Sequence, residues 1–308
     1  MCTTCGCSDD AGVSLTLLNA QTTTPTLEHK HEHEHEHEHE HERGHKHSHP
    51  HDSGHVHEHA HEHEHEHEHE HEHEHEHEHA HEQASTTVVV QQEILAKNQL
   101  LAERNRGWFA GRNILALNLV SSPGSGQTTL LERTIRDLGR EISISVIGGD
   151  QATANDARRI AATGCKTVQI NTGTGCHLDA DMVARGLREL DPPSNSLLMI
   201  ENVGNLVCPA LFDLGERCKV AILSVTEGED KPVKYPHMFR AAKLMILNKV
   251  DLLPYLEFDV ERCIDYARQV NPKIQIIQLS GQKGEGLAQW YDWLRAERQA
   301  SGNHAVPA

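Results

Sequence analysis

The stretch ILALNLVSSPGSGQTT, residues 114–129, carries the strongest signal for the fold. Residues 114–120 are a continuous apolar run, the pattern of a strand that is buried on both faces. SSPGSGQTT follows at once at 121–129, and a segment with helical spacing begins at 128. A strand, a glycine-rich turn and a helix in this order can bind phosphate through backbone N–H groups and the positive end of the helix. An ordinary strand-turn-helix is the competing interpretation.

Within this loop, the N–H groups of Gly124, Ser125 and Gly126 are expected to surround a β-phosphate. The Thr128 hydroxyl is the expected Mg²⁺ ligand, with Thr129 next to it in the nucleotide site.

The loop departs twice from the general pattern G-x-x-x-x-G-K-[ST], with Ser121 at the first glycine position and Gln127 at the lysine position. The second departure matters more, because a neutral amide cannot neutralise phosphate charge as an ammonium group does. Gln127 therefore puts nucleotide affinity and hydrolysis in doubt.

Working outward, apolar β-rich runs alternate with helical segments, which indicates an α/β fold with a mostly parallel sheet flanked by helices. Strands are expected at 114–120, 142–147, 167–170, 197–200, 220–225, 244–247 and 274–279. An amphipathic entry helix is expected at 87–106, and further helices at 128–140, 154–162, 179–190, 260–270 and 287–298.

A guanine-binding motif follows the strand expected at 244–247. The sequence NKVD at 248–251 supplies Asn248, Lys249 and Asp251, and the Asp251 carboxylate can accept both guanine N1–H and N2–H, whereas adenine offers no matching pair. At the next strand end, a backbone N–H near Ser280 and Gly281 can reach guanine O6. NKxD by itself also fits a solvated turn, but three such signals at the carboxyl ends of strands together predict GTP and GDP as ligands.

Two acidic residues follow strands where carboxylates can act on phosphates. Asp150 and Glu201 are placed to hold Mg²⁺ or to orient the attacking water, and with Gln127 they are the predicted catalytic residues. Gly204 can offer a backbone N–H to the γ-phosphate. Helix caps or solvated loop residues are the alternative interpretation of both carboxylates.

Residues 28–82 have an unlike composition. They hold 25 of the 28 histidines, 19 acidic residues and 3 basic ones, mostly as alternating His and Glu. Neither face of such a strand is apolar, so we expect disorder without metal and weak binding of several divalent ions, and an engineered purification tag is the alternative. The representative ligands named for this tract are His31, His33, His35, His61, His63 and His65.

The first seven residues, MCTTCGC, place Cys2, Cys5 and Cys7 close together. Three thiolates with the amino terminus favour Ni²⁺, with Zn²⁺ as the alternative ion, while idle tail thiols are the competing interpretation. A second candidate metal site is Cys176-His177, where two copies of the chain could together supply four ligands. Cys208 can join that site, although a buried cysteine beside a helix cap is the more common outcome.

Other patterns exclude several classes of protein. Outside 28–82 the chain has 25 basic and 27 acidic residues, so no basic surplus indicates a nucleic-acid partner. No apolar run approaches the roughly 20 residues that span a bilayer, and the N-terminus lacks the layout of a signal peptide. We therefore expect a cytoplasmic protein without a membrane partner.

The combined motifs resemble the HypB family, the GTPases that help insert nickel during [NiFe] hydrogenase maturation. The resemblance rests on MCTTCGC (1–7), LVSSPGSGQTTLL (119–131), NTGTGCHLDA (171–180), ENVGNLVCPA (201–210), LSVTEGEDKPVKYPHMF (223–239) and NKVDLLPYL (248–256). It implies a high-affinity nickel site at the first cysteines, nickel storage on the His-rich insert, a metal site at Cys176 and His177, and a GTP-dependent homodimer. The implied partners are a HypA-like nickel protein and the hydrogenase large-subunit precursor. The family shares Ser121 but carries Lys where this chain has Gln127.

These observations predict a nickel-binding GTPase metallochaperone that hydrolyses GTP to GDP and phosphate. Its predicted organisation is a Cys motif and linker (1–27), a disordered His/Glu tract (28–86), a P-loop GTPase domain (87–301) and a flexible tail (302–308). The alternative function, favoured by Gln127, is a non-hydrolysing nickel or zinc storage protein with a degenerate nucleotide site.

Overall fold

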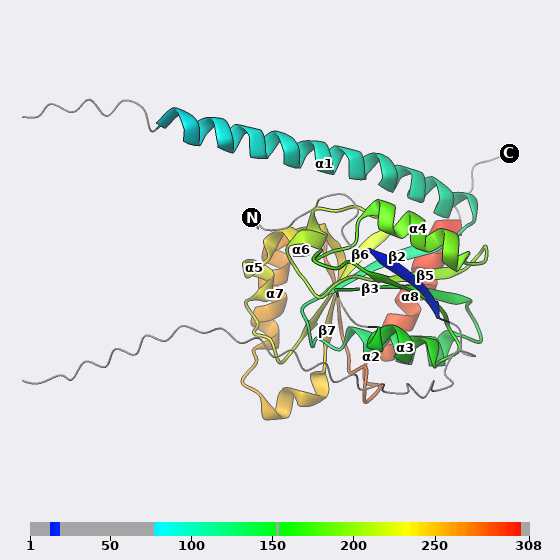
Figure 1. Cartoon of the computed structure of the whole chain (residues 1–308). Coiled ribbons are helices and arrows are strands. Elements are labelled where there is room, and N and C mark those ends of the chain that lie inside the picture. The colour runs from blue at the N-terminus through cyan, green and yellow to red at the C-terminus, as the bar shows by residue number, and fades with distance from the viewer. Residues whose placement is uncertain (1–12, 19–76, 152–153, 303–308) are drawn as a thin grey trace, which may run out of the picture. The chain divides into compact units, whose positions relative to one another are not determined.

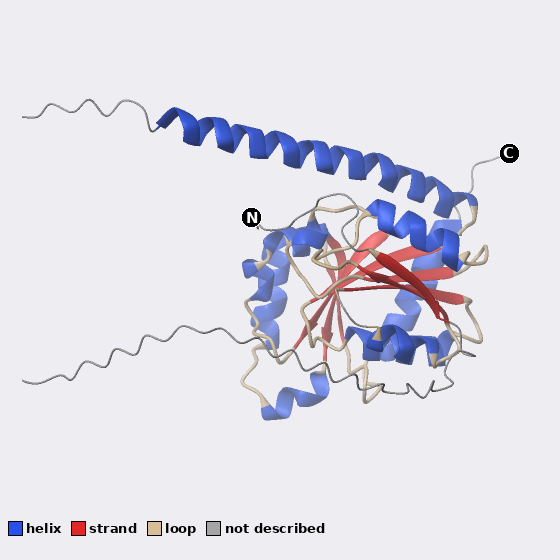
Figure 2. Cartoon of the chain, viewed as in Figure 1, coloured by secondary structure: helices blue, strands red, loops and turns tan. Residues whose placement is uncertain are grey.

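The computed structural model describes residues 13–18, 77–151 and 154–302, without side-chain detail for 77–91 and 302. Contacts divide the chain into residues 25–86 and a second unit made of 1–24 and 87–308. The second unit is a sheet with helices on both faces, as Figures 1 and 2 show. The mostly parallel α/β architecture predicted from the alternation of apolar runs and helices is therefore confirmed.

The sheet contains eight strands in the order β1-β4-β3-β5-β2-β6-β7-β8. The strands are β1 (Ser14–Leu18), β2 (Leu115–Ser121), β3 (Ile144–Asp150), β4 (Lys166–Asn171), β5 (Leu197–Glu201), β6 (Cys218–Ser224), β7 (Ala242–Asn248) and β8 (Gln275–Gln278). The helices are α1 (His77–Gly111), α2 (Gln127–Leu138), α3 (Asn155–Ala161), α4 (Ala180–Leu190), α5 (Lys231–Lys234), α6 (Pro236–Ala241), α7 (Val260–Val270) and α8 (Leu287–Gly302), with 3₁₀-helices η2 (Cys208–Ala210) and η3 (Val250–Tyr255).

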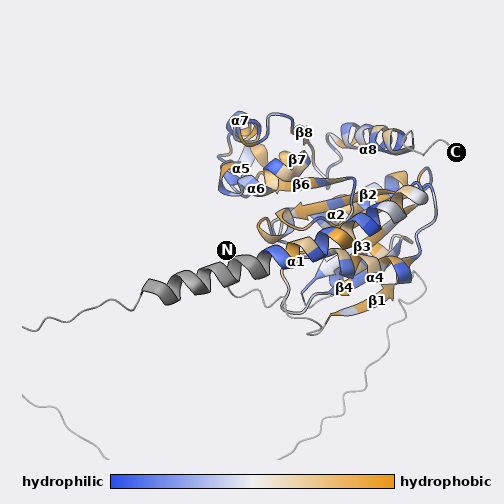
Figure 3. Cartoon of the chain, turned by 90° about the horizontal axis from the view of Figure 1, so that it is seen from above, coloured by the Kyte–Doolittle hydropathy of each residue, from blue (hydrophilic) through white to orange (hydrophobic). Residues whose placement is uncertain are grey.

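The parallel strands are buried on both faces because helices cover each side. One face packs against α2, α3 and α8, with Trp290 of α8 fully buried. The other face packs against α1 and α4 at one end and against α6 and α7 at the other. Figure 3 shows the hydrophobic strands between these helices. Continuous apolar runs, rather than alternating ones, are what this double burial requires.

Strand β1 corrects the prediction that residues 1–27 contain only a metal motif and a linker. It pairs antiparallel with β4, with Ser14 opposite Asn171 and Leu18 opposite Thr167. The strand is short and lies at the sheet edge, so it needs only one paired neighbour and little apolar sequence. For this reason five residues, SLTLL, gave no clear signal in the sequence.

Helix α1 corrects the boundary of the predicted disordered tract. It begins at His77, inside the stretch 28–86, rather than near residue 87. Alanine, glutamate and glutamine are good helix formers, so Glu78, Ala80 and Gln83 can extend a helix that begins elsewhere. The first cysteines (within 1–12), the end of the predicted linker and most of the tract (together 19–76), and the end of the tail (303–308) lie outside the described residues. Within the described residues, no helix is long and apolar enough to span a membrane.

The sheet order brings the predicted site together at one edge. β2 lies between β5 and β6, and β3 pairs with β5, all parallel. The segments that follow β2, β3 and β5 therefore leave the sheet at the same edge, which is where ligands bind in open α/β sheets.

Candidate nucleotide and metal sites

The glycine-rich loop between β2 and α2 has the backbone shape of a phosphate cradle. Gly124 has φ 79° and Gly126 has φ 89°, a left-handed conformation that side chains rarely adopt. A Cβ atom on Gly126 would also lie 2.6 Å from Asn248 Nδ2, so this position has no room for a side chain. α2 begins at the next residue, which directs its unpaired N–H groups and positive end toward the loop.

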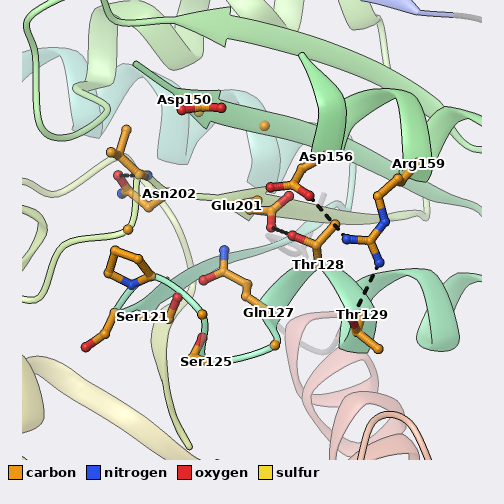
Figure 4. Close-up of a pocket in the computed structure, with 18 of the residues that line it drawn as sticks. Ser121, Ser125, Gln127, Thr128, Thr129, Asp150, Asp156, Arg159, Glu201 and Asn202 are labelled. Atoms are coloured by element: carbon orange, nitrogen blue, oxygen red, sulfur yellow. Dashed lines mark hydrogen bonds and ion pairs between the residues drawn. The ribbon is translucent and has the colours of Figure 1, made fainter. Parts of the chain in front are cut away.

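A cavity of about 560 Å³ lies over this loop (Figure 4). Its lining includes most of the predicted phosphate-site and catalytic residues, from several separate segments of the chain. These are Ser121, Gly124, Ser125, Gly126, Gln127, Thr128, Thr129, Asp150, Glu201, Gly204 and Lys249.

Asn248 joins the phosphate loop to the base motif. Its Nδ2 donates to the Ser125 carbonyl at 2.9 Å, and its Oδ1 accepts from the N–H groups of Lys249 at 2.8 Å and Gly281 at 3.1 Å. Lys249 Nζ donates to the Gly124 carbonyl at 2.6 Å. Two elements more than a hundred residues apart are thus held in one arrangement.

Of the base-motif residues, Lys249 lines the cavity, whereas Asp251, Ser280 and Gly281 are not among its lining residues. Asp251 is half-buried in the first turn of η3, and Ser280 is buried, with its Oγ accepting from the Lys283 N–H at 3.0 Å. The Gly281 N–H, predicted to reach a base carbonyl, donates to Asn248 instead. The guanine-binding role of these residues stays a prediction.

Gln127 occupies the cation position of the loop as a buried amide. Its Nε2 donates to the Leu119 carbonyl at 3.4 Å, a long contact. Its Oε1 is buried and has no hydrogen-bond partner among the described residues. An acceptor oxygen repels phosphate oxygens, so the amide must turn its NH₂ group toward a phosphate to bind it, and even then it brings no charge.

Glu201 and Thr128 lie next to each other in the lining of the cavity and point toward each other (Figure 4). The Thr128 hydroxyl donates to Glu201 Oε1 at 2.8 Å. Donation of its hydrogen fixes the direction of the Thr128 lone pairs and leaves them available to a cation. Burial raises the pKa of the Glu201 carboxyl to about 7, although the hydrogen bond from Thr128 opposes the rise.

Asp150 and Gly204 approach the same cavity from β3 and from the loop after β5. Asp150 ends β3, and its Oδ1 accepts the Gln151 N–H at 2.6 Å. A Cβ atom on Gly204 would lie 3.0 Å from Pro123 Cγ, so this backbone lies directly against the phosphate loop. The contacts of both positions to phosphate or Mg²⁺ stay predictions.

Arg159 and Asp156 of α3 also line the cavity, and sequence reasoning did not select them. Arg159 Nη2 donates to Glu132 Oε2 at 2.9 Å. The same nitrogen lies 3.5 Å from Thr129 Oγ1, the contact drawn in Figure 4. Neither residue belongs to a recognisable motif. Only the packing of α3 beside α2 brings this guanidinium to the phosphate loop.

Cys176, His177 and Cys208 form the second cluster, and their ligand atoms all lie within 4.8 Å of one another. The Cys176 Sγ lies 3.1 Å from the Cys208 Sγ and 3.7 Å from the His177 Nδ1. Burial lowers the pKa of His177, which favours the neutral imidazole that a metal ion needs. One chain thus brings together three ligands, one more than the adjacent Cys-His pair, because η2 carries Cys208 to the loop before α4.

The remaining thiols of the globular unit do not join this cluster. Cys165 and Cys263 are buried and Cys218 is half-buried, and burial raises the pKa of each to about 12. A thiol that stays protonated is a poor metal ligand.

The chain shows extensive similarity to known proteins. Residues 115–278 match the family described as CobW/HypB/UreG, nucleotide-binding domain. Hydrogenase maturation factor HypB of Escherichia coli (strain K12) is 63% identical over 211 residues, covering 68% of this chain and 73% of that protein. Probable hydrogenase maturation factor HypB of Methanocaldococcus jannaschii is 38% identical over 198 residues, covering 64% of this chain and 90% of that protein.

Two solved structures share the fold. The crystal structure of hydrogenase maturation factor HypB from Archaeoglobus fulgidus has a TM-score of 0.62 and 42% identity, covering 66% of this chain and 99% of that one. HypB from Helicobacter pylori in complex with nickel has a TM-score of 0.63 and 34% identity, covering 66% of this chain and 96% of that one.

The buried Glu201 carboxyl predicts a pH-dependent stability. Its folded-state pKa of about 7 exceeds the usual 4.5, so the stabilising contribution of the bound proton is complete below about pH 4.5 and is lost as the pH rises through about 7. Without nucleotide or Mg²⁺, Glu201→Gln should therefore be more stable than the parent at pH 8, by about 3 kcal/mol at most, and similar to it at pH 5. Urea unfolding at both pH values measures this. Glu103→Gln, on the surface of α1, is the control, and an equal difference at both pH values would contradict the prediction.

Proposed function

Because the chain belongs to the HypB family of hydrogenase maturation factors, we propose that it is a nickel-binding GTPase that delivers nickel to the [NiFe] hydrogenase precursor in a GTP-dependent step. The observation that supports this most directly is the hydrogen bonding of Asn248. These hydrogen bonds join the phosphate loop to the base motif. A nucleotide, which has phosphates at one end and a base at the other, needs both elements held at a fixed separation. The nickel complex of the Helicobacter pylori relative supports the choice of metal.

In the proposed nucleotide site, the N–H groups of Gly124, Ser125 and Gly126 hold the β-phosphate, and the N–H of Gly204 contacts the γ-phosphate. The Ser125 hydroxyl is buried without a partner among the described residues, so it can donate to a phosphate oxygen. Asp251 accepts the two N–H groups of the guanine edge, and Asn248 holds the surrounding loops in place.

The donor set at the cavity fits Mg²⁺, a hard cation that prefers oxygen ligands. The Thr128 hydroxyl and the Asp150 carboxylate would hold it, and the ion would supply charge neutralisation at the phosphate oxygens. Glu201 positions Thr128 by accepting its hydroxyl hydrogen. With a pKa near neutrality, Glu201 can also accept a hydrogen bond or a proton from the attacking water.

The cation deficit left by Gln127 makes the other positive groups important. Lys249 and Arg159 are the lysine and arginine side chains that line the cavity within the described part of the chain. Lys249 already donates to the Gly124 carbonyl, and Arg159 is paired with Glu132 and Asp156. Lys231 is not among the residues that line the cavity, and its Nζ pairs with Glu227 Oε2 at 3.6 Å. Hydrolysis should therefore be slow.

The Cys176, His177 and Cys208 cluster fits nickel or zinc as cargo, with two sulfur ligands and one nitrogen ligand. We assign the tight nickel site to Cys2, Cys5 and Cys7 and weaker storage to the His-rich tract, both outside the described residues. GTP binding favours one conformation or homodimer and hydrolysis releases it. The two states differ in their affinity for nickel, or for a HypA-like partner or the precursor. This difference makes transfer directional.

A non-hydrolysing nickel or zinc storage protein is the second candidate. Gln127 favours it, since the buried amide brings no charge to the phosphates. Binding and hydrolysis of a fluorescent GTP analogue by the purified protein distinguish the two. Binding without turnover supports storage, and turnover supports the GTPase.

Guanine selectivity tests the base site. Asp251→Asn replaces an acceptor with an amide that matches the xanthine edge, so GTP should bind more weakly and xanthosine triphosphate more tightly. Competition binding against a labelled nucleotide measures both. Equal competition by GTP and ATP for the unmutated protein would show that the base site is assigned wrongly.

Restoring the loop cation tests the role of Gln127. Gln127→Lys should raise kcat on the order of a hundredfold, the effect of about 3 kcal/mol of charge stabilisation in the transition state, and should also tighten GTP binding. Both proteins are assayed under the same Mg²⁺ and salt, and nickel binding at Cys2, Cys5 and Cys7 serves as the unchanged control. Equal turnover would mean that Lys249 or Arg159 already supplies the charge.

The tight and loose nickel classes are separable by competition. Thiolates hold Ni²⁺ more firmly than scattered imidazoles, so one equivalent should remain with Cys2, Cys5 and Cys7 under a chelator that strips the tract. Substituting these three cysteines with serine should remove that equivalent, whereas deleting residues 28–82 should lower the total stoichiometry and retain it. Loss of the tight equivalent on the deletion would contradict the division.

A further inference from the structure

Helix α1 contacts both segments that carry the ligands of the Cys176, His177 and Cys208 cluster. Cys176 and His177 lie in the loop that leads into α4, which begins at Ala180, while Cys208 begins η2, after which the chain continues through residues 211–216. Figure 1 shows α1 running beside α4. Phe109 of α1 belongs to one apolar cluster with Leu178 and Leu214, and buried polar contacts add bridges between the two segments.

Asn98 makes the first bridge. Its Nδ2 donates to the Asp213 carbonyl at 2.8 Å, and its Oδ1 accepts from the Ala180 N–H at 2.9 Å. The side chain is buried, 7% exposed, so both hydrogen bonds are protected from water. Ala180 opens α4, and Asn98 therefore also satisfies an otherwise unpaired N–H at the start of that helix.

Asn105 makes a second bridge between the same two segments. It lies seven residues after Asn98, and thus two turns along the same face of α1. Its Nδ2 donates to the Ala180 carbonyl at 2.8 Å and to the Leu214 carbonyl at 3.0 Å. Two asparagines on one face hold the same pair of backbone segments.

The loop after η2 also lies directly against the helix backbone. Gly215 has φ 88°, and a Cβ atom there would lie 2.5 Å from the Ala102 carbonyl oxygen. Arg106 Nη1 donates to the Glu216 carbonyl at 3.1 Å. Residues 213–216 therefore have little freedom to move away from α1.

Short connections join these held atoms to the ligands. Ala180 is three residues after His177, and Asp213 is next to Phe212, whose ring lies 3.9 Å from the His177 ring between centroids. Phe212 is in turn four residues after Cys208. Asn205 joins the two segments directly, since its Nδ2 donates to the Cys176 carbonyl at 3.2 Å. The face of α1 that both segments contact holds them at a second place, on the other side of the ligands in sequence.

We propose that Asn98 is a positioning residue for the metal cluster, which acts by fixing Cys208 relative to Cys176 and His177. The proposal rests on the proposed function in that the cluster binds a metal ion. Groups that orient ligands typically change metal affinity by about 10- to 100-fold when removed, without touching the ion.

The test uses the full-length chain with Cys2, Cys5 and Cys7 changed to serine, so that nickel-thiolate absorption reports the cluster. The imidazoles and carboxylates of the His-rich tract lack thiolates and give no such absorption. Nickel titration against a chelator should show affinity about 10-fold or more weaker for Asn98→Ala than for its parent. Gln99→Ala, at an exposed neighbour that bonds Glu103 at 3.0 Å, is the matched control and should equal the parent. Equal affinity of Asn98→Ala and the parent would overturn the proposal.

A double-mutant cycle with Cys208→Ser separates positioning from general support of the fold. If Asn98 acts by placing Cys208, Asn98→Ala should have little further effect on nickel affinity once Cys208 is serine. The same loss in both backgrounds would overturn the proposal. A Cys208→Ser variant with unchanged nickel absorption and affinity would instead show that the cluster is not the metal site, a failure of the proposed function.

Asn98→Asp covers the case in which the alanine variant does not fold. Its carboxylate still accepts the Ala180 N–H but cannot donate to the Asp213 carbonyl, so it releases only the segment that carries Cys208. The same weakening of nickel binding is expected, with guanine-nucleotide binding unchanged. Loss of the fold in both variants would overturn the proposal, because Asn98 would then serve folding rather than the cluster.

Discussion

The buried amide of Asn248 is the contact on which the nucleotide site depends. Its two polar atoms connect the backbone of the phosphate loop with the backbone that follows β8, and the side chain is only 2% exposed. Removing one partner of such a buried set leaves donors and acceptors unpaired, which is costly. The close approach of Asn248 to Gly126 also explains why that position must be glycine. The shape of the phosphate loop and its attachment to the base motif thus depend on one side chain.

Charge at the cavity is distributed unusually for a phosphate site. The loop contributes an uncharged Gln127, while Glu201 is buried beside Thr128 with a pKa of about 7. A protonated Glu201 lowers the negative charge of the cavity, which partly offsets the missing lysine. Arg159 and Lys249 stand at the margins, already engaged with protein groups. In the proposed nucleotide site, backbone N–H groups and a divalent cation would therefore make most of the contacts to the polyphosphate.

The segment after β5 connects the two sites physically. Glu201 bonds Thr128 in the phosphate loop, and the next residue, Asn202, accepts the Leu178 N–H at 3.1 Å, beside His177. The same segment continues to Cys208. A shift of this segment on nucleotide binding would move groups at both sites, and α1 would resist it from the opposite side through Asn98 and Asn105. Such a shared element is what coupling between two sites requires.

The sequence by itself determined the family, which the comparisons confirm, and the alternation of buried strands and helices that specifies the sheet. Local patterns suffice there, because a parallel strand shows its double burial as an apolar run and the loop shows its backbone shape as glycines. The short edge strand β1, the early start of α1 at His77 and the short helices α5 and α6 carry too few patterned residues to be predicted. The sequence also named Cys208 as a possible partner of Cys176 and His177, and the structure brings the three together. Only the tertiary structure decided that Arg159 reaches the phosphate loop and that Asn98 bridges the segments around that cluster. These contacts join residues far apart in the chain, and their geometry is set by how the helices pack on the sheet rather than by any local pattern.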